Sequence, residues 1–133
     1  MHKVLIVDDN FENRQLIAEI LRDVTACDFA ATGKEAIEAY NLSLQNKTPY
    51  SLILLDIELP EVSGLDILDK IRQSEKKAGI SLGEGIHIII VTAYKKRFLE
   101  AYNKGCDDYI LKPIDTDILL QKIASALEKA SDK

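Results

Sequence analysis

The chain has 133 residues, of which 47% are hydrophobic and 29% charged, as in a single soluble globular domain rather than a disordered chain. Asp and Glu outnumber Lys and Arg by 22 to 17, and the formal net charge of −5 argues against binding nucleic acid through bulk electrostatics. No apolar run approaches the roughly 18–20 residues that span a bilayer. The short apolar run 4–7 ends at Asp8, so we predict no secretory signal and expect a cytoplasmic protein that does not bind membranes.

The chain contains two cysteines, Cys27 and Cys106, far apart in the sequence. Neither belongs to a CxxC motif or to a cluster with histidine, which argues against structural zinc. The sequence leaves a disulfide between them open, but two free thiols are the expected state in a cytoplasmic protein.

Short β-rich runs alternate along the chain with longer segments of helical apolar spacing. The predicted strands are 4–7, 27–31, 52–55, 86–91 and 107–111. The helical apolar positions fall within 16–24, 36–44, 65–71, 95–104 and 119–127. Three of the strand runs are continuously apolar, as expected for strands covered on both faces. The alternation predicts an α/β fold whose parallel sheet has helices on both sides.

Helix boundaries are indicated by capping residues. Thr32 precedes Glu35 by three residues, which is a capping-box spacing, and Ser63 and Asp115 are candidate N-caps of later helices. Gly105 is placed to end the helix 95–104. The segment 76–85 contains three glycines and is expected to be a flexible surface loop without a site.

Polar side chains follow four of the predicted strands. They are Asp8 and Asp9 after the first, Asp56 at the end of the third, Thr92 after the fourth and Lys112 after the fifth. Each one alone is commonly a helix cap, a turn residue or a solvated lysine. Because ligand sites in open α/β sheets form at the carboxyl ends of the strands, we expect all five to converge on one functional site.

The residue types at this site point to phosphoryl chemistry. Three close carboxylates repel one another unless a cation lies between them, and oxygen ligands without His or Cys favour Mg²⁺, with Mn²⁺ as a substitute. Such a centre brings an anionic phosphoryl donor to a carboxylate, which as nucleophile forms an acyl phosphate. Lys112 would supply the opposite charge to the transferred group, and Thr92 a hydroxyl donor to one of its oxygens.

Four motifs together give the sequence a specific resemblance to the receiver domains of two-component response regulators. They are V-L-I-V-D-D-N at 4–10, L-L-D-I-E-L-P-E-V-S-G at 54–64, V-T-A at 91–93 and G-C-D-D-Y-I-L-K-P at 105–113. The resemblance covers nearly the whole chain. It implies a flavodoxin-like (βα)5 three-layer sandwich of strand order 2-1-3-4-5, with residues 1–133 forming one receiver domain and no output domain. Leu59 stands where Met is common, and Ser63 where Asp is common.

The resemblance also implies roles for the acidic residues. Asp56 would be the phosphoacceptor, and Asp8 and Asp9 the acidic pair that holds Mg²⁺, with Asp9 the more direct ligand. The backbone carbonyl of Glu58 would be a further ligand of the metal.

Further roles are implied for residues beyond the acidic cluster. Thr92 and Lys112 would contact the phosphoryl group, and the Lys112–Pro113 bond would be cis. Tyr109 occupies the place of the family's switch aromatic. Phosphorylation would move Thr92 toward the phosphoryl group, and Tyr109 would rotate into the space that Thr92 leaves. The face formed by helix 95–104, strand 107–111 and the last helix would then change.

The function that these features predict is a phosphorelay signalling module. Its partners would be a histidine kinase or histidine phosphotransfer protein and a downstream protein effector. It would catalyse its own phosphorylation and dephosphorylation without turning over an external substrate, and would be a monomer or a phosphorylation-dependent dimer. The alternative is a receiver domain excised from a hybrid histidine kinase or a multidomain regulator.

Three other function classes fit the sequence less well. A phosphatase of the haloacid dehalogenase type needs a D-x-D motif, whereas Asp8 and Asp9 are adjacent. A flavodoxin-like cofactor binder needs a phosphate-cradling loop, whereas the acidic segment 7–10 would repel phosphate. A non-phosphorylated binding module on the same fold would have no need of all five site residues, and Mg²⁺ binding would distinguish it.

Overall fold

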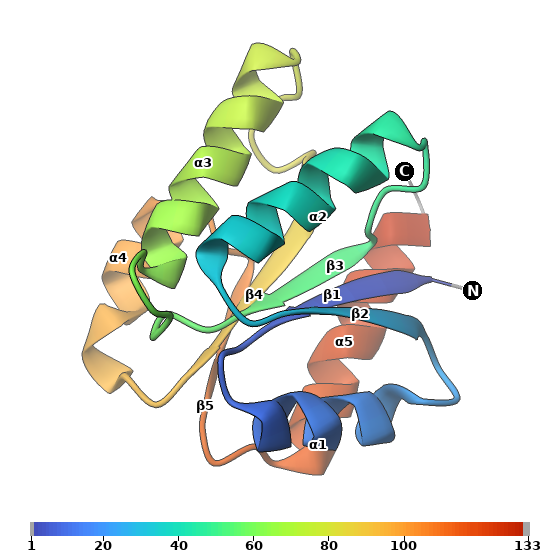
Figure 1. Cartoon of the computed structure of the whole chain (residues 1–133), viewed down its shortest axis with the longest axis vertical. Helices are drawn as coiled ribbons and strands as arrows, with labels where there is room; N and C mark the ends of the chain where they lie inside the picture. Colours follow the sequence, from blue (N-terminus) through green and yellow to red (C-terminus); the bar gives the residue numbers. More distant parts are fainter. Residues whose placement is uncertain (1, 132–133) are drawn as a thin grey trace.

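The computed structural model describes residues 2–131 and contains one parallel five-stranded sheet (Figure 1). The strands are β1 (Lys3–Val7), β2 (Ala26–Ala30), β3 (Leu52–Leu55), β4 (His87–Thr92) and β5 (Asp108–Leu111). Their order across the sheet is β2-β1-β3-β4-β5, and every neighbouring pair is parallel. The predicted strands and the predicted order are both confirmed.

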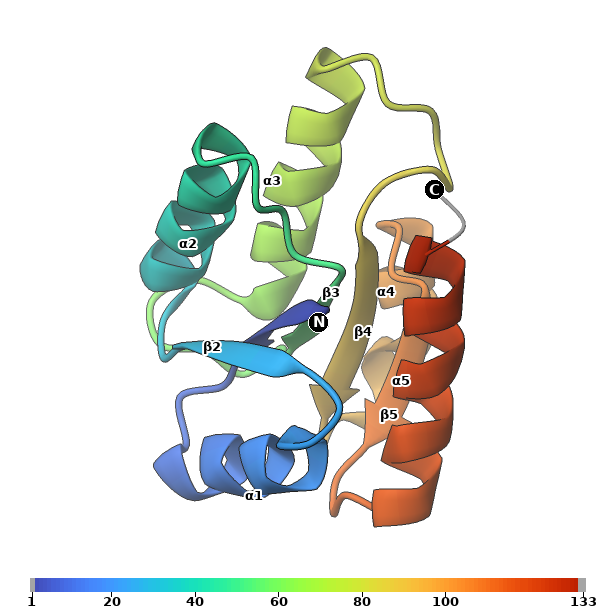
Figure 2. The same ribbon diagram turned by 90° about the vertical axis from the view of Figure 1, so that its right-hand side faces the viewer.

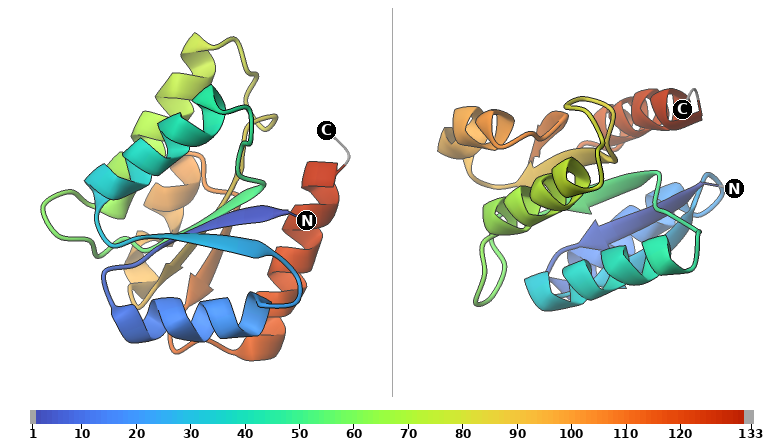
Figure 3. Two further views of the ribbon diagram at one scale, coloured as in Figure 1. Left: turned by 45° about the vertical axis from the view of Figure 1, so that its right-hand side comes forward. Right: turned by 90° about the horizontal axis from the view of Figure 1, so that it is seen from above.

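Helices cover both sides of this sheet. They are α1 (Phe11–Leu21), α2 (Gly33–Gln45), α3 (Gly64–Lys77), α4 (Phe98–Asn103), preceded by a 3-10 turn at Lys95–Arg97, and α5 (Thr116–Ser131). Figures 2 and 3 show α2 and α3 on one side, with α1 and α5 on the other. The three-layer α/β sandwich is therefore confirmed. None of these described helices is long and apolar enough to cross a membrane.

Each face of the sheet has its own hydrophobic core. In β1, Leu5 and Val7 pack on the side of α2 and α3, whereas Val4 and Ile6 pack on the side of α1 and α5. Successive side chains of a strand point to opposite faces, so a strand covered on both faces must be apolar at every position. This is the physical reason for the continuous apolar runs in the sequence.

Some predicted core positions of the helices prove to be exposed. Leu16 and Val24 are exposed, because α1 turns Ile17 and Leu21 to the core and ends at Leu21. Leu44, predicted to lie on the apolar face of α2, is exposed as well. The apolar faces predicted for α3 and α5 are confirmed.

The predicted helix caps form, with one difference at the capping box. The Thr32 hydroxyl accepts a hydrogen bond from the Glu35 N–H at 3.1 Å, but the Glu35 carboxylate accepts from Ala31, one residue before the cap. Ser63 caps α3 through the Leu65 N–H. Asp115 caps α5 in the same way, and Gly105 ends α4 in a left-handed conformation with φ of 103°.

The connection between α3 and β4 is fastened at both ends, although the sequence predicted a flexible loop. The Glu75 carboxylate accepts hydrogen bonds from Arg72 and from the Ile86 N–H, both at 2.6 Å. Arg72 also donates to the Gly105 carbonyl and to Asp107, which joins α3 to the start of β5. A hollow of about 700 Å³ lies between α3, this connection and the end of α4.

Both cysteines are free thiols, which was the expected state. Cys106 is buried beside β5, and this burial raises the pKa of its thiol to about 12. Because the thiolate is the reactive form, this upward shift of the pKa makes the Cys106 thiol less reactive than an exposed one.

Gly64, the first residue of α3, generates a prediction about the loop behind Asp56. A Cβ at Gly64 would lie 1.9 Å from the Asp56 carbonyl oxygen, and backbone cannot yield as a side chain can. We expect Gly64→Ala to lower the free energy of unfolding by about 3 kcal/mol, measured by urea denaturation. Gly33→Ala is the matched control, because its Cβ would meet side-chain atoms of Ile67 and Val62 rather than backbone, with the Ile67 terminal methyl nearest at 2.7 Å; an equal loss in both variants would contradict the prediction.

Candidate active site at the carboxyl edge of the sheet

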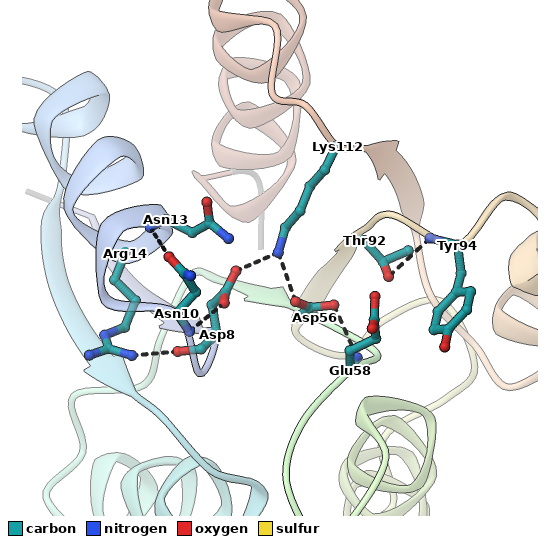
Figure 4. A network of polar contacts seen from close by, with 9 residues as sticks. All are labelled: Asp8, Asn10, Asn13, Arg14, Asp56, Glu58, Thr92, Tyr94 and Lys112. Carbon is teal, nitrogen blue, oxygen red and sulfur yellow. Dashed lines mark hydrogen bonds and ion pairs between the residues drawn. The ribbon is translucent and has the colours of Figure 1, made fainter.

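The residues predicted to converge do so at the carboxyl edge of the sheet (Figure 4). Val7 pairs with Leu55 in the ladder between β1 and β3, so the residues that follow them, Asp8 and Asp56, lie side by side. Both carboxylates are buried although they carry charge. Lys112 reaches them from the end of β5.

The ammonium of Lys112 bridges the two buried carboxylates. Its Nζ lies 2.8 Å from an oxygen of Asp8 and 2.8 Å from an oxygen of Asp56. Burial by itself lowers the pKa of Lys112, but its hydrogen bonds to Asp56 and Asp8 outweigh burial, and the net shift of the pKa is upward. Lys112 therefore remains charged, as a partner for the two carboxylates must be.

Backbone N–H groups hold the second oxygen of each carboxylate. Asp8 Oδ1 accepts from the Asn10 N–H at 2.9 Å, and Asp56 Oδ1 accepts from the Glu58 N–H at 3.1 Å. Both carboxylates are thus fixed in orientation by the loops that carry them, while carboxylate oxygens retain lone pairs for further ligands.

Asp9 completes a cluster that fits a divalent cation. Asp8, Asp9 and Asp56 each offer an oxygen, and these atoms lie within 4.8 Å of one another. The Asp9 side chain is exposed, and within residues 2–131 it makes no hydrogen bond or ion pair. The Lys112 ammonium contacts only Asp8 and Asp56 among these three carboxylates, so the pocket keeps an excess of negative charge, and its oxygen donors are those that suit Mg²⁺. The role of the Glu58 carbonyl stays a prediction.

Thr92 is fully buried as the last residue of β4. Its hydroxyl accepts a long hydrogen bond of 3.4 Å from the Tyr94 N–H, and Figure 4 shows it on the β4 side of Asp56. No hydrogen bond joins Thr92 to Asp56 within the part of the chain that the structure describes. Its predicted contact with a phosphoryl group stays a prediction.

Tyr109 connects this edge to α4. Its ring is buried, and its hydroxyl donates a hydrogen bond to the Tyr94 carbonyl. Burial also raises the pKa of this phenol, so it keeps its proton as a donor. Tyr94 therefore binds Thr92 through its N–H and Tyr109 through its carbonyl. The peptide bond between Lys112 and Pro113 is cis, as the resemblance implied.

Two residues near the site were missed in the sequence. Asn10 caps α1 by accepting from the Asn13 N–H at 2.9 Å, and Arg14 donates to the Asp8 carbonyl at 2.7 Å. Asn is a preferred N-cap residue, so the D-D-N run already contained a signal for Asn10. Arg14 had no comparable signal, since its contact depends on how α1 leaves the loop.

The fold and the arrangement of the acidic residues, Thr92 and Lys112 are in agreement with the protein family that this sequence matches. The family described as response regulator receiver domain matches residues 4–124. The chain belongs to this family. As a receiver domain it is a module of phosphorelay signalling.

Curated relatives contain this domain within longer proteins. Hybrid signal transduction histidine kinase I of Dictyostelium discoideum is 37% identical over 96% of this chain, which covers 7% of that kinase. Response regulator ArlR of Staphylococcus saprophyticus is 34% identical over 100% of this chain, which covers 56% of that regulator. The chain thus spans a small part of the kinase and about half of the regulator.

A solved relative contains Mg²⁺ and beryllium fluoride. The response regulator TrrA of Thermotoga maritima, solved in complex with Mg²⁺ and beryllium fluoride, superposes with a TM-score of 0.78 at 30% identity. The match covers 96% of this chain and 100% of that one. Mg²⁺ binding thus occurs within the family, in agreement with the acidic cluster found here.

The bridging ammonium yields a prediction for stability. Replacing Lys112 with Met leaves two buried carboxylates without a cation, which we expect to lower the free energy of unfolding by about 3 kcal/mol in metal-free buffer. Urea denaturation measures this loss. Lys122→Met is the matched control, because among residues 2–131 Lys122 pairs with the partly exposed Asp108 alone, and its loss should cost about 0.5 kcal/mol. Equal losses in the two variants would contradict the bridging role.

Proposed function

We propose that this receiver domain accepts a phosphoryl group on Asp56 in a Mg²⁺-dependent reaction. The donor is the phosphohistidine of a histidine kinase or of a histidine phosphotransfer protein. The observation that carries the proposal is the setting of the Asp56 carboxylate. It is buried, held by Lys112 and by the Glu58 N–H, and placed beside two further acidic residues.

In the transfer, an Asp56 oxygen attacks phosphorus while the bond from phosphorus to the histidine nitrogen breaks. The Glu58 N–H holds one Asp56 oxygen, and the other, which contacts Lys112, is the oxygen that reacts. Lys112, already in contact with Asp56, then offsets charge on the transferred group, and Thr92 supplies a hydroxyl donor. A Mg²⁺ ion held by Asp8, Asp9, Asp56 and the Glu58 carbonyl would neutralise further charge on the phosphoryl oxygens.

Phosphorylation also changes the hydrogen bonding beyond the pocket. A phosphoryl oxygen would accept a hydrogen bond from the Thr92 hydroxyl, and a move of Thr92 toward it would stretch the bond that this hydroxyl accepts from the Tyr94 N–H, which is already long. Since Tyr94 also binds Tyr109, a move of Thr92 reaches α4 and β5. The face formed by α4, β5 and α5 is therefore the surface that we assign to a downstream protein effector, with the basic turn Lys95–Arg97 at its edge.

The proposal describes a signalling module without an external turnover substrate. The chain catalyses transfer to its own Asp56 and the later hydrolysis of that acyl phosphate. Either a stand-alone regulator or the receiver part of a hybrid kinase or multidomain regulator uses the domain in this way, and the hybrid kinase and the regulator ArlR that are similar to this chain are both longer proteins.

Phosphate uptake tests the assignment of Asp56. We expect the wild-type chain to incorporate label from radioactive acetyl phosphate in the presence of Mg²⁺, and Asp56→Asn to lose it by more than tenfold, on the order of the loss of a nucleophile. Asp66→Asn is the control, because Asp66 is an exposed acid in the first turn of α3. Stoichiometric labelling of Asp56→Asn would overturn the assignment.

Metal binding is tested separately by thermal unfolding in a Mg²⁺ titration. A ligand that binds only the folded state raises the melting temperature, with a gain of about 2.7 kcal/mol at a hundred times the Kd. We expect Asp9→Asn to weaken Mg²⁺ binding about tenfold or more and Glu12→Gln, an exposed acid of α1, to leave it unchanged. Mn²⁺ in a parallel titration checks the predicted substitute. A melting temperature of the wild-type chain that does not change as Mg²⁺ is added would contradict the metal site.

A further inference from the structure

Three aromatic rings form a row that links β5 to the surface of α4. The Phe98 ring, on the first residue of α4, lies 5.7 Å from the Tyr109 ring in an edge-to-face arrangement with an interplanar angle of 61°. The Phe98 ring also lies 4.7 Å from the Tyr102 ring, which is one helical turn further along α4. Phe98 therefore contacts a ring of the sheet and a ring of its own helix.

The row crosses from the core to the surface. Tyr109 is only 9% exposed, whereas Phe98 is 51% exposed. Two interactions hold the Tyr109 side chain in this buried orientation: its hydroxyl donates to the Tyr94 carbonyl, and its ring packs against Phe98. A Tyr109 side chain turned outward would break the hydrogen bond and leave the Phe98 ring.

The short length of α4 makes this contact important for the helix as well. Six residues are too few to form a stable helix by local hydrogen bonding, so α4 depends on tertiary packing. Ala101 is its one buried residue within the described chain, and Phe98 contacts the sheet at its beginning. The first turn of α4 and the orientation of Tyr109 are thus coupled through one pair of rings.

We propose that Phe98 is a positioning residue that holds Tyr109 in its buried orientation and so biases the equilibrium between the two states of the α4–β5 surface. The inference rests on the proposed function in one respect, because it takes Tyr109 to be the aromatic residue whose orientation changes on phosphorylation. The physical basis is the edge-to-face contact that the Phe98 ring makes with the buried Tyr109 ring, which stabilises the buried orientation to the extent that this contact is lost when Tyr109 turns outward.

The test follows the Tyr109 ring directly by ¹⁹F NMR of protein labelled with 3-fluorotyrosine. Tyr109→Phe identifies its resonance among the five tyrosines. We expect Phe98→Ala to shift this resonance toward the exposed position, by about a two- to tenfold change in the ratio of buried to outward forms. Leu99→Ala is the matched control, because Leu99 is the next residue of α4 and is 67% exposed. Its Tyr109 resonance should match the wild type.

Two further measurements keep the test independent of folding. Phe98→Leu preserves apolar volume but removes the ring, and we expect a smaller shift in the same direction. Addition of Mg²⁺ and beryllium fluoride, as a phosphoryl analogue, should return the Tyr109 resonance of both variants toward the buried position. An unmoved Tyr109 resonance in Phe98→Ala and Phe98→Leu would overturn the inference, and so would an equal shift in Leu99→Ala.

Failure of this inference is distinguishable from failure of the proposed function. Incorporation of label from acetyl phosphate is measured on the same samples and reports on Asp56 alone. Normal incorporation with an unmoved Tyr109 resonance rejects the role of Phe98 only. A Tyr109 resonance that moves in the Phe98 variants, in a chain that takes up no label, supports the role of Phe98 while rejecting phosphoryl transfer to Asp56.

Discussion

The ion contact on which this structure depends is that of Lys112 with Asp8 and Asp56. It joins the ends of three strands, because Asp8 follows β1, Asp56 follows β3 and Lys112 follows β5. Taking carboxylates out of water is costly unless a cation and hydrogen-bond donors replace the water. Lys112 and the N–H groups of Asn10 and Glu58 supply that replacement, and they leave Asp9 facing solvent.

Both ends of the sheet place one cation between two carboxylates. At the amino end, Arg72 contacts Glu75 and Asp107 and donates to two backbone carbonyls, which holds the connections in place. At the carboxyl end, Lys112 contacts Asp8 and Asp56, and Asp9 adds a third carboxylate that Lys112 does not contact. This third carboxylate gives the carboxyl end an open acidic site that suits a cation.

The route from this pocket to the surface is short and passes through main-chain atoms of one residue. Tyr94 donates to Thr92 at the end of β4 and accepts from Tyr109 in β5, while Phe98 packs against the Tyr109 ring. A change at Thr92 thus needs to cross only two hydrogen bonds and one ring contact to reach α4. The small size of α4 fits this role, since a helix held by few contacts moves at low energetic cost.

The sequence by itself determined the order of elements, the parallel sheet and the edge at which polar residues gather, because each of these follows from local patterns of apolar and polar residues. The acidic residues Asp8, Asp9 and Asp56 were predictable as one site for the same reason, since parallel strands end at a common edge. The apolar residues Leu16, Val24 and Leu44 were misplaced, because exposure depends on where a helix ends and how it is rotated.

Only the tertiary structure decided which atoms meet. Three contacts arise from the way whole elements pack against one another. They are the bridge of Lys112 to Asp8 and Asp56, the hydrogen bond of Arg14 to the Asp8 carbonyl, and the hydrogen bond of Arg72 to the Gly105 carbonyl. The ring row at Phe98 belongs to the same class, since the fold brings α4 over β5. Such contacts depend on side-chain reach and direction across elements, which residue spacing within one element does not encode.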